Sequence, residues 1–203
     1  MSSHHLLVDG PDDAPLTLAL AHGAGAPSAS PWMARFARAV AAKGFRVARF
    51  DFPYMASGKR GAPDREPVLR KTWLEVIEQL GGGARLAIGG KSMGGRMASY
   101  VADGANVRGL VCLGYPFHPP GNKEKLRTAH LAELRTPTLI VQGSRDPFGT
   151  REDIAGYALS PAIRIHFIEG GDHSFKTPAR VGTEAAAVEE AIGAVAEFLA
   201  GLT

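Results

Sequence analysis

Short apolar runs alternate with helix-patterned stretches along nearly the whole chain, and this alternation constrains the fold more than any other feature. The apolar runs are rich in aliphatic and β-branched residues and lack strict polar alternation: 16–21, 46–50, 85–89, 107–113, 138–142 and 164–168. Such runs are typical of strands that are covered on both faces. Strands that alternate with helices favour a mostly parallel sheet with helices on both sides.

Helical spacing is found in three stretches between or after these runs. Apolar residues recur on one helix face in 33–41, 69–80 and 185–199, and each stripe is expected to pack in the core. Gly81, Gly82 and Gly83 follow the second stripe, where glycine can end a helix. The run 6–8 is a candidate antiparallel edge strand. We predict an α/β fold of about six or seven strands in a single domain, 1–203, without a long linker.

Composition excludes several functional classes. The chain has one cysteine, Cys112, which rules out an intramolecular disulfide and a cysteine-built zinc site. Cys112 lies inside a predicted strand, so we expect it in the core. A net charge of +3 over 203 residues does not favour a nucleic-acid partner. The sequence has no stretch of about 18 apolar residues, so we expect no membrane partner and a cytoplasmic protein.

Ser92 lies in a glycine-flanked motif, Gly90-Lys91-Ser92-Met93-Gly94, directly after the predicted strand 85–89. This G-x-S-x-G pattern between a strand and a helix is typical of a nucleophile elbow, in which a tight turn exposes a reactive serine. Small residues are needed on both sides of such a crowded turn. The turn leaves Ser92 at a helix N-terminus, where the Met93 amide faces a developing negative charge.

Two nucleotide-binding interpretations of the glycines fit poorly. A phosphate-binding loop ending in Gly90-Lys91-Ser92 requires glycine at position 85, which is Arg85. The residues that would form that loop are instead the apolar strand. A dinucleotide fingerprint beginning at Gly23 would require a third glycine where Ser28 stands.

His173 is the best candidate for a base that activates Ser92. It follows the last predicted strand, in the loop 169–175, so it lies at the carboxyl edge of the sheet. Asp146 follows the preceding strand and is our predicted orienting acid. Asp172 is the alternative, although sequential neighbours project in different directions and seldom hydrogen-bond ring to carboxylate.

The loop 22–27, His-Gly-Ala-Gly-Ala-Pro, follows the first long strand. Its glycines allow the backbone to approach a substrate, and the amide of Ala24 is the predicted second donor of an oxyanion hole, beside that of Met93. His22 is expected to tie this loop to the rest of the protein through a hydrogen bond.

These motifs resemble the α/β-hydrolase superfamily, and more narrowly its small dienelactone-hydrolase-like branch that includes testis-expressed and chromatin-complex hydrolase-like proteins. The matching segments are HGAGAP, FDFPYM, GGKSMGGRMAS, GYPFHPPG, LIVQGSRDPFG and GGDHSF. The resemblance implies an α/β-hydrolase fold, the triad Ser92–Asp146–His173, an oxyanion hole at Ala24 and Met93, and no metal or cofactor. Only 115–136 separate two predicted strands, so no lid domain is expected. Because no cysteine replaces Ser92, dienelactone chemistry is not assumed.

We therefore expect a serine hydrolase that cleaves carboxylic esters or thioesters through an acyl-enzyme, acting on small-molecule or exposed polymeric esters. Four residues at the same sheet edge are predicted to line an apolar pocket: Met55, Tyr115, Phe117 and Phe148. The main alternative is a non-catalytic interaction module of the same fold, which usually loses part of the triad. Acyl transfer or peptide cleavage by the same residues is a further alternative.

Overall fold

A seven-stranded sheet in the order β1-β3-β2-β4-β5-β6-β7 organises the protein. The computed structural model describes residues 3–58 and 62–203. Only β1 is antiparallel, pairing with β3 at the edge, and the other neighbouring strands pair in parallel, as the sequence predicts. The strands are β1 (Leu6–Asp9), β2 (Thr17–Ala21), β3 (Arg46–Phe50), β4 (Leu86–Lys91), β5 (Gly109–Leu113), β6 (Thr138–Gly143) and β7 (Ile163–Ile168).

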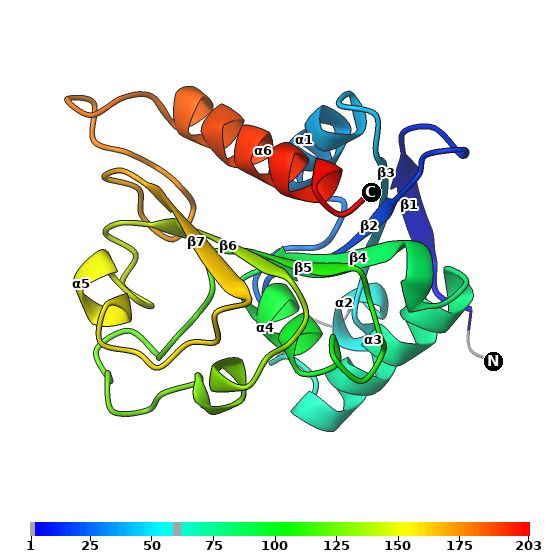
Figure 1. Cartoon of the computed structure of the whole chain (residues 1–203), viewed down its shortest axis with the longest axis horizontal. Helices are drawn as coiled ribbons and strands as arrows, with labels where there is room; N and C mark the ends of the chain where they lie inside the picture. Colours follow the sequence, from blue (N-terminus) through cyan, green and yellow to red (C-terminus); the bar gives the residue numbers. More distant parts are fainter. Residues whose placement is uncertain (1–2, 59–61) are drawn as a thin grey trace.

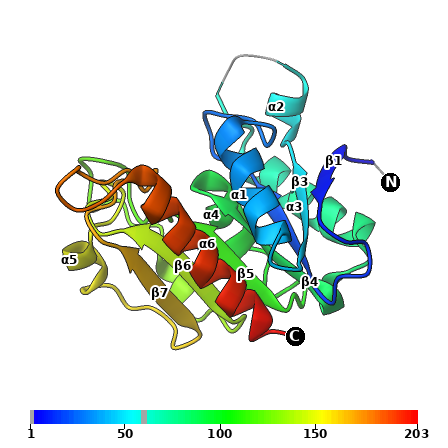
Figure 2. The same ribbon diagram turned by 90° about the horizontal axis from the view of Figure 1, so that it is seen from above.

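Helices cover both faces of this sheet. The α-helices are α1 (Pro31–Ala41), α2 (Pro53–Ala56), α3 (Glu66–Gln79), α4 (Met93–Ser99), α5 (Arg151–Ile154) and α6 (Glu184–Ala200), with 3-10 turns η1 (Gly83–Arg85) and η2 (Ala129–Ala132). Figure 1 shows α1 and α6 on one face and α2, α3 and α4 on the other. The first two lie side by side across the strands (Figure 2). None of the helices described is long and apolar enough to cross a membrane.

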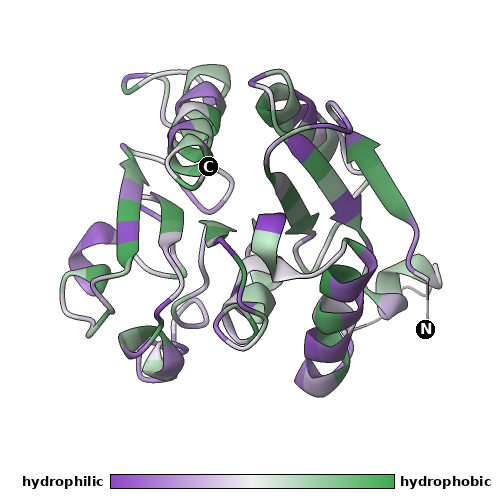
Figure 3. Cartoon of the chain, turned by 45° about the vertical axis from the view of Figure 1, so that its right-hand side comes forward, coloured by the Kyte–Doolittle hydropathy of each residue, from purple (hydrophilic) through white to green (hydrophobic). Residues whose placement is uncertain are grey.

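Two separate cores form because successive strand residues point to opposite faces. In β2, Leu18 and Leu20 pack under α1 and α6, whereas Ala19 and Ala21 face α3 and α4. The helices carry hydrophobic and hydrophilic bands in Figure 3, as expected of helices with one buried side. Cys112 is 1% exposed in β5, which confirms its predicted place in the core.

The strand boundaries differ slightly from the sequence prediction. β4 begins one residue later than predicted, because Arg85 closes the turn η1. β5 begins at Gly109 rather than at 107. The predicted helix end is found: α3 ends at Gln79, and Gly81 and Gly82 have φ values of 91° and 87°, which suit glycine.

The predicted absence of a lid domain is also found. Residues 115–136, between β5 and β6, contain no regular element other than η2. Parallel strands end at one edge of the sheet, so the loops after β2, β4, β6 and β7 lie on the same side of the molecule. That shared edge carries the candidate site.

Candidate active site

Ser92 stands at a strained turn between β4 and α4. Its backbone angles are φ 51° and ψ −112°, a conformation that non-glycine residues rarely adopt. The flanking glycines are required because β2 lies against the turn. A Cβ atom at Gly90 would lie 2.2 Å from the carbonyl oxygen of Ala21, and one at Gly94 would lie 2.5 Å from the same atom. Strain of this kind clusters at functional sites.

A continuous hydrogen-bonded relay links Ser92 to a buried carboxylate. The hydroxyl oxygen of Ser92 lies 2.9 Å from His173 Nε2. On the other side of the ring, His173 Nδ1 lies 2.7 Å from Asp146 Oδ2. With the ring proton on Nδ1 donated to Asp146, Nε2 is free to accept the serine proton. The sequence motifs therefore come together in space, with the geometry that an activated serine requires.

Asp146 is fully buried, and polar groups hold both of its oxygens. Gln142 Nε2 donates to Oδ2 at 2.9 Å, and the Phe148 amide donates to Oδ1 at 2.8 Å. The rival Asp172 forms no hydrogen bond with the His173 ring among the described residues. Its Oδ1 accepts from the amides of Ser174 and Lys176, so this carboxylate shapes the loop that carries His173.

The loop after β2 lies beside Ser92. His22 is buried, donates from Nδ1 to the Gly23 carbonyl at 2.6 Å, and accepts the Phe52 amide at Nε2 at 3.1 Å. The bond to Phe52 ties the loop to the segment that follows β3, as predicted. Burial lowers the pKa of His22, which favours the neutral ring that this pairing needs. The Tyr54 hydroxyl also donates to the Ala24 carbonyl at 3.0 Å, which fixes the loop further.

Two cavities meet at Ser92. The apolar cavity, about 410 Å³, is lined by residues that include Trp32, Met33, Lys91 and His173. The arginine cavity, about 310 Å³, is lined by residues that include Met93, Arg96, Arg127, Asp64 and Glu66. Ala24, Ser92 and Phe148 border both cavities. Met93 starts α4, where helix N–H groups have no partner within the helix, and Ala24, on the loop after β2, lines the same cavity as Met93.

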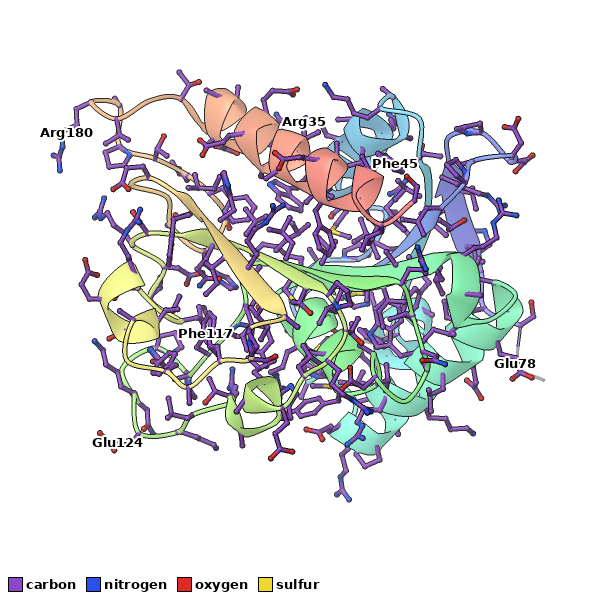
Figure 4. All side chains as sticks on the ribbon, viewed as in Figure 1. Arg35, Phe45, Glu78, Phe117, Glu124 and Arg180 are labelled. Carbon is purple, nitrogen blue, oxygen red and sulfur yellow. The ribbon has the colours of Figure 1, made fainter. Side chains whose placement is uncertain are left out.

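Three predicted pocket residues do not line these cavities. Tyr115 and Phe117 are fully buried; their rings pack against each other, and the Tyr115 hydroxyl donates to the Arg127 carbonyl. Figure 4 labels Phe117 within the packed interior near α5. Met55, in α2, is partly buried and packs against the hydrophobic core. These residues follow strands at the carboxyl edge of the sheet, as predicted, but their side chains point into the core. Of the four, only Phe148 faces both cavities.

Four residues that the sequence analysis did not assign belong to the site. Lys91 Nζ donates to the His173 carbonyl at 2.5 Å and lies 5.7 Å from the Phe175 ring centre. Burial lowers the pKa of Lys91 to about 8, although nearby carboxylates oppose the shift. The others are Gln142, Arg96 and Arg127. Lys91 and Arg96 lie in or next to the serine motif, which was a usable signal, whereas Arg127 has no local motif.

Comparison with known proteins places most of the chain in one family. Residues 14–200 match the family model described as "Alpha/beta hydrolase domain". The lid-less serine hydrolase XC6422 from Xanthomonas campestris superposes with a TM-score of 0.70 at 17% identity, covering 96% of this chain and 87% of that one. A dienelactone hydrolase from Anabaena variabilis superposes with a TM-score of 0.75 at 19% identity, covering 97% of this chain and 90% of that one. A monoacylglycerol lipase from Paleococcus ferrophilus superposes with a TM-score of 0.75 at 16% identity, covering 100% of each chain.

At these identities the three solved structures show a shared fold. The family match, by contrast, spans most of the sequence and includes the serine turn and both partner loops. The chain belongs to the α/β-hydrolase family.

Proposed function

We propose that this protein is a serine hydrolase that cleaves carboxylic esters, or thioesters, through a covalent acyl-enzyme. The observation that carries the proposal is the unbroken path from Ser92 through His173 to Asp146, with both hydrogen bonds shorter than 3 Å. Family membership and the hydrolase neighbours support a hydrolytic activity. The narrower resemblance to testis-expressed and chromatin-complex hydrolase-like proteins remains a prediction.

In the proposed first half-reaction, His173 Nε2 takes the proton of the Ser92 hydroxyl as its oxygen attacks the ester carbonyl carbon. Asp146 holds the ring and stabilises the imidazolium that forms. The amides of Met93 and Ala24 donate to the oxyanion of the tetrahedral intermediate. His173 then returns the proton to the leaving alcohol oxygen as the carbon–oxygen bond breaks.

In the second half-reaction, water gives a proton to His173 and attacks the acyl-enzyme carbonyl. The intermediate collapses, Ser92 regains its proton from His173, and the carboxylic acid leaves. The cavities beside Ser92 favour short soluble esters or exposed ester groups of a polymer over long-chain lipids.

Turnover of p-nitrophenyl butyrate tests the role of Ser92. Ser92→Ala should reduce kcat by about 10⁶-fold, the size of loss seen when a serine nucleophile of a triad is removed. Ser3→Ala, which removes an exposed hydroxyl from a residue that lines neither cavity, is the matched control and should retain wild-type turnover. Retained activity in Ser92→Ala would refute the proposal.

A further inference from the structure

The position of His173 assigns the two halves of an ester to the two cavities. In an acyl transfer the imidazole must reach the leaving oxygen, because it supplies that oxygen with its proton. His173 lines the apolar cavity and does not line the arginine cavity. The alcohol half of the substrate therefore leaves through the apolar cavity, beside Trp32 and Met33. The acyl half extends the other way, past Met93, into the arginine cavity.

The arginine cavity brings two guanidinium groups close to the nucleophile. Arg96 lies in α4, and its amide bonds to the carbonyl oxygen of Ser92, so it is one helical turn from the reacting serine. Its Nε is buried and has no hydrogen-bond partner among the described residues. Arg127 comes from the loop after β5, and among the residues that the structure describes its side chain donates only to the Pro116 carbonyl, at 3.5 Å.

Carboxylates in the same wall leave much of this positive charge without a close partner. Glu66 is shared between Arg70, at 3.5 Å, and Arg96, at 3.9 Å, which are long distances for an ion pair. Asp64 accepts the Tyr54 amide at 2.9 Å. Within 3–58 and 62–203, no carboxylate forms an ion pair with Arg127.

The electrostatic environment agrees with this arrangement. Burial lowers the pKa of Arg127, and the neighbouring charge of Arg96 lowers it further. Burial also lowers the pKa of His130 to about 4, again with a contribution from the Arg96 charge. The positive field of Arg96 therefore acts on two neighbours despite the presence of Glu66. A ligand anion placed between Arg96 and Arg127 would relieve their repulsion.

We propose that the arginine cavity binds a carboxylate at the far end of the acyl chain, so that the preferred substrates are half-esters of short dicarboxylic acids with an apolar alcohol. This inference rests on the proposed function, because it assigns specificity to the same Ser92 site. Arginine favours such a ligand because its planar group can donate two parallel hydrogen bonds to a carboxylate.

A pair of isosteric esters tests the proposal. Monobenzyl glutarate carries the terminal carboxylate, whereas benzyl 4-carbamoylbutanoate replaces it with a neutral amide of nearly the same shape. The wild-type protein should show kcat/KM about 10- to 100-fold higher for the carboxylate, the range expected for hydrogen bonds to a charged group. The preference should weaken at high salt.

Variants of the arginines localise the effect. Arg127→Gln and Arg96→Gln should each lower the ratio of the two kcat/KM values, and Arg127→Lys should retain part of it. Arg180→Met is the matched control, because Arg180 is exposed on the loop before α6, away from both cavities (Figure 4), and its loss removes the same charge. This control should keep the wild-type ratio.

Inhibition of the wild-type protein by small diacids tests the same subsite without any variant, so it remains informative if a variant is unstable. Glutarate should inhibit p-nitrophenyl acetate turnover competitively in the wild type, and glutaramide should inhibit far less. The subsite proposal is overturned if p-nitrophenyl acetate is hydrolysed while the benzyl pair shows no preference for the carboxylate, or if neither benzyl ester reacts. Absence of Ser92-dependent turnover of p-nitrophenyl acetate would instead refute the proposed function itself.

Discussion

His22 and His173 occupy similar places in the fold but have different partners. Each follows a parallel strand, β2 or β7, at the same edge of the sheet, and each ring uses both nitrogens. His22 contacts the backbone of Gly23 and Phe52, whereas His173 contacts the side chains of Ser92 and Asp146.

This difference shows what separates a structural histidine from a candidate base. The backbone partners of His22 fix one neutral tautomer. The Gly23 carbonyl and Asp51, 3.7 Å from Nε2, favour a positive ring, but burial outweighs them and lowers the pKa of His22. The partners of His173 are a hydroxyl that can lose a proton and a buried carboxylate that can stabilise the resulting imidazolium. Position at the carboxyl edge is shared, so position alone does not identify the base.

The largest loss of kcat in this comparison is expected when Asp146, the carboxylate that hydrogen-bonds to His173, is replaced. Asp146→Asn should lower kcat by about 10⁴-fold, because an amide at this position favours the wrong ring tautomer. Asp172→Asn is the matched control in the adjacent loop and should cause a much smaller loss, measured with p-nitrophenyl butyrate. The reverse ranking would identify Asp172 as the acid.

A smaller loss of kcat is expected when the hydrogen bond that tethers the His173 carbonyl to Lys91 is removed. Lys91→Met removes the hydrogen bond to the His173 carbonyl, and kcat should fall about 10- to 100-fold through misplacement of the ring. KM should change less, and Lys176→Met, an exposed lysine on the same loop, provides the control. An unchanged kcat in Lys91→Met would mean that the tether does not position His173.

Loss of His22 should act on stability. His22→Leu leaves the buried Phe52 amide without its acceptor, so the free energy of unfolding should fall by about 1–3 kcal/mol. His173→Gln should change stability less, because the ring lies at the border of a cavity and a glutamine amide can still donate to Asp146. Urea unfolding of both variants makes the comparison, and equal losses would contradict the structural role assigned to His22.

Lowering the pH should reduce the free energy of unfolding by a modest amount per pH unit, through two buried histidines. Burial lowers the pKa of His22, and that of His130 falls to about 4, so the unfolded chain binds more protons below about pH 6.5. Their stabilising effect is complete above that pH and is lost as pH falls through the lowered pKa of each histidine, which for His130 is about 4. Each group contributes at most about 1.4 kcal/mol per pH unit. Thermal unfolding between pH 7 and 5 measures this loss, which His130→Gln should reduce.

Much of the architecture could be predicted because it depends on local patterns. The strand runs, the glycines after α3 and the serine turn are all contiguous in sequence, and the order of strands and helices sets which loops share an edge. The choice of Asp146 over Asp172 also followed from local geometry, since a carboxylate adjacent to the ring projects elsewhere.

The pocket could not be predicted in the same way. Tyr115 and Phe117 follow β5 at the correct edge, but the chain turns inward there because Gln142 bonds to both the amide and the carbonyl of Tyr115. Arg127 reaches the arginine cavity from a loop without a periodic pattern. Which way a loop side chain points depends on contacts distant in sequence, and no single motif encodes them.

Covalent labelling tests the central claim most directly. The wild-type protein, treated with a fluorophosphonate probe and mapped by mass spectrometry, should carry one adduct, on the peptide that contains Ser92. Labelling should disappear in Ser92→Ala and slow strongly in His173→Gln. An adduct on another residue, or labelling that persists unchanged in Ser92→Ala, would contradict the assignment of Ser92 as the nucleophile.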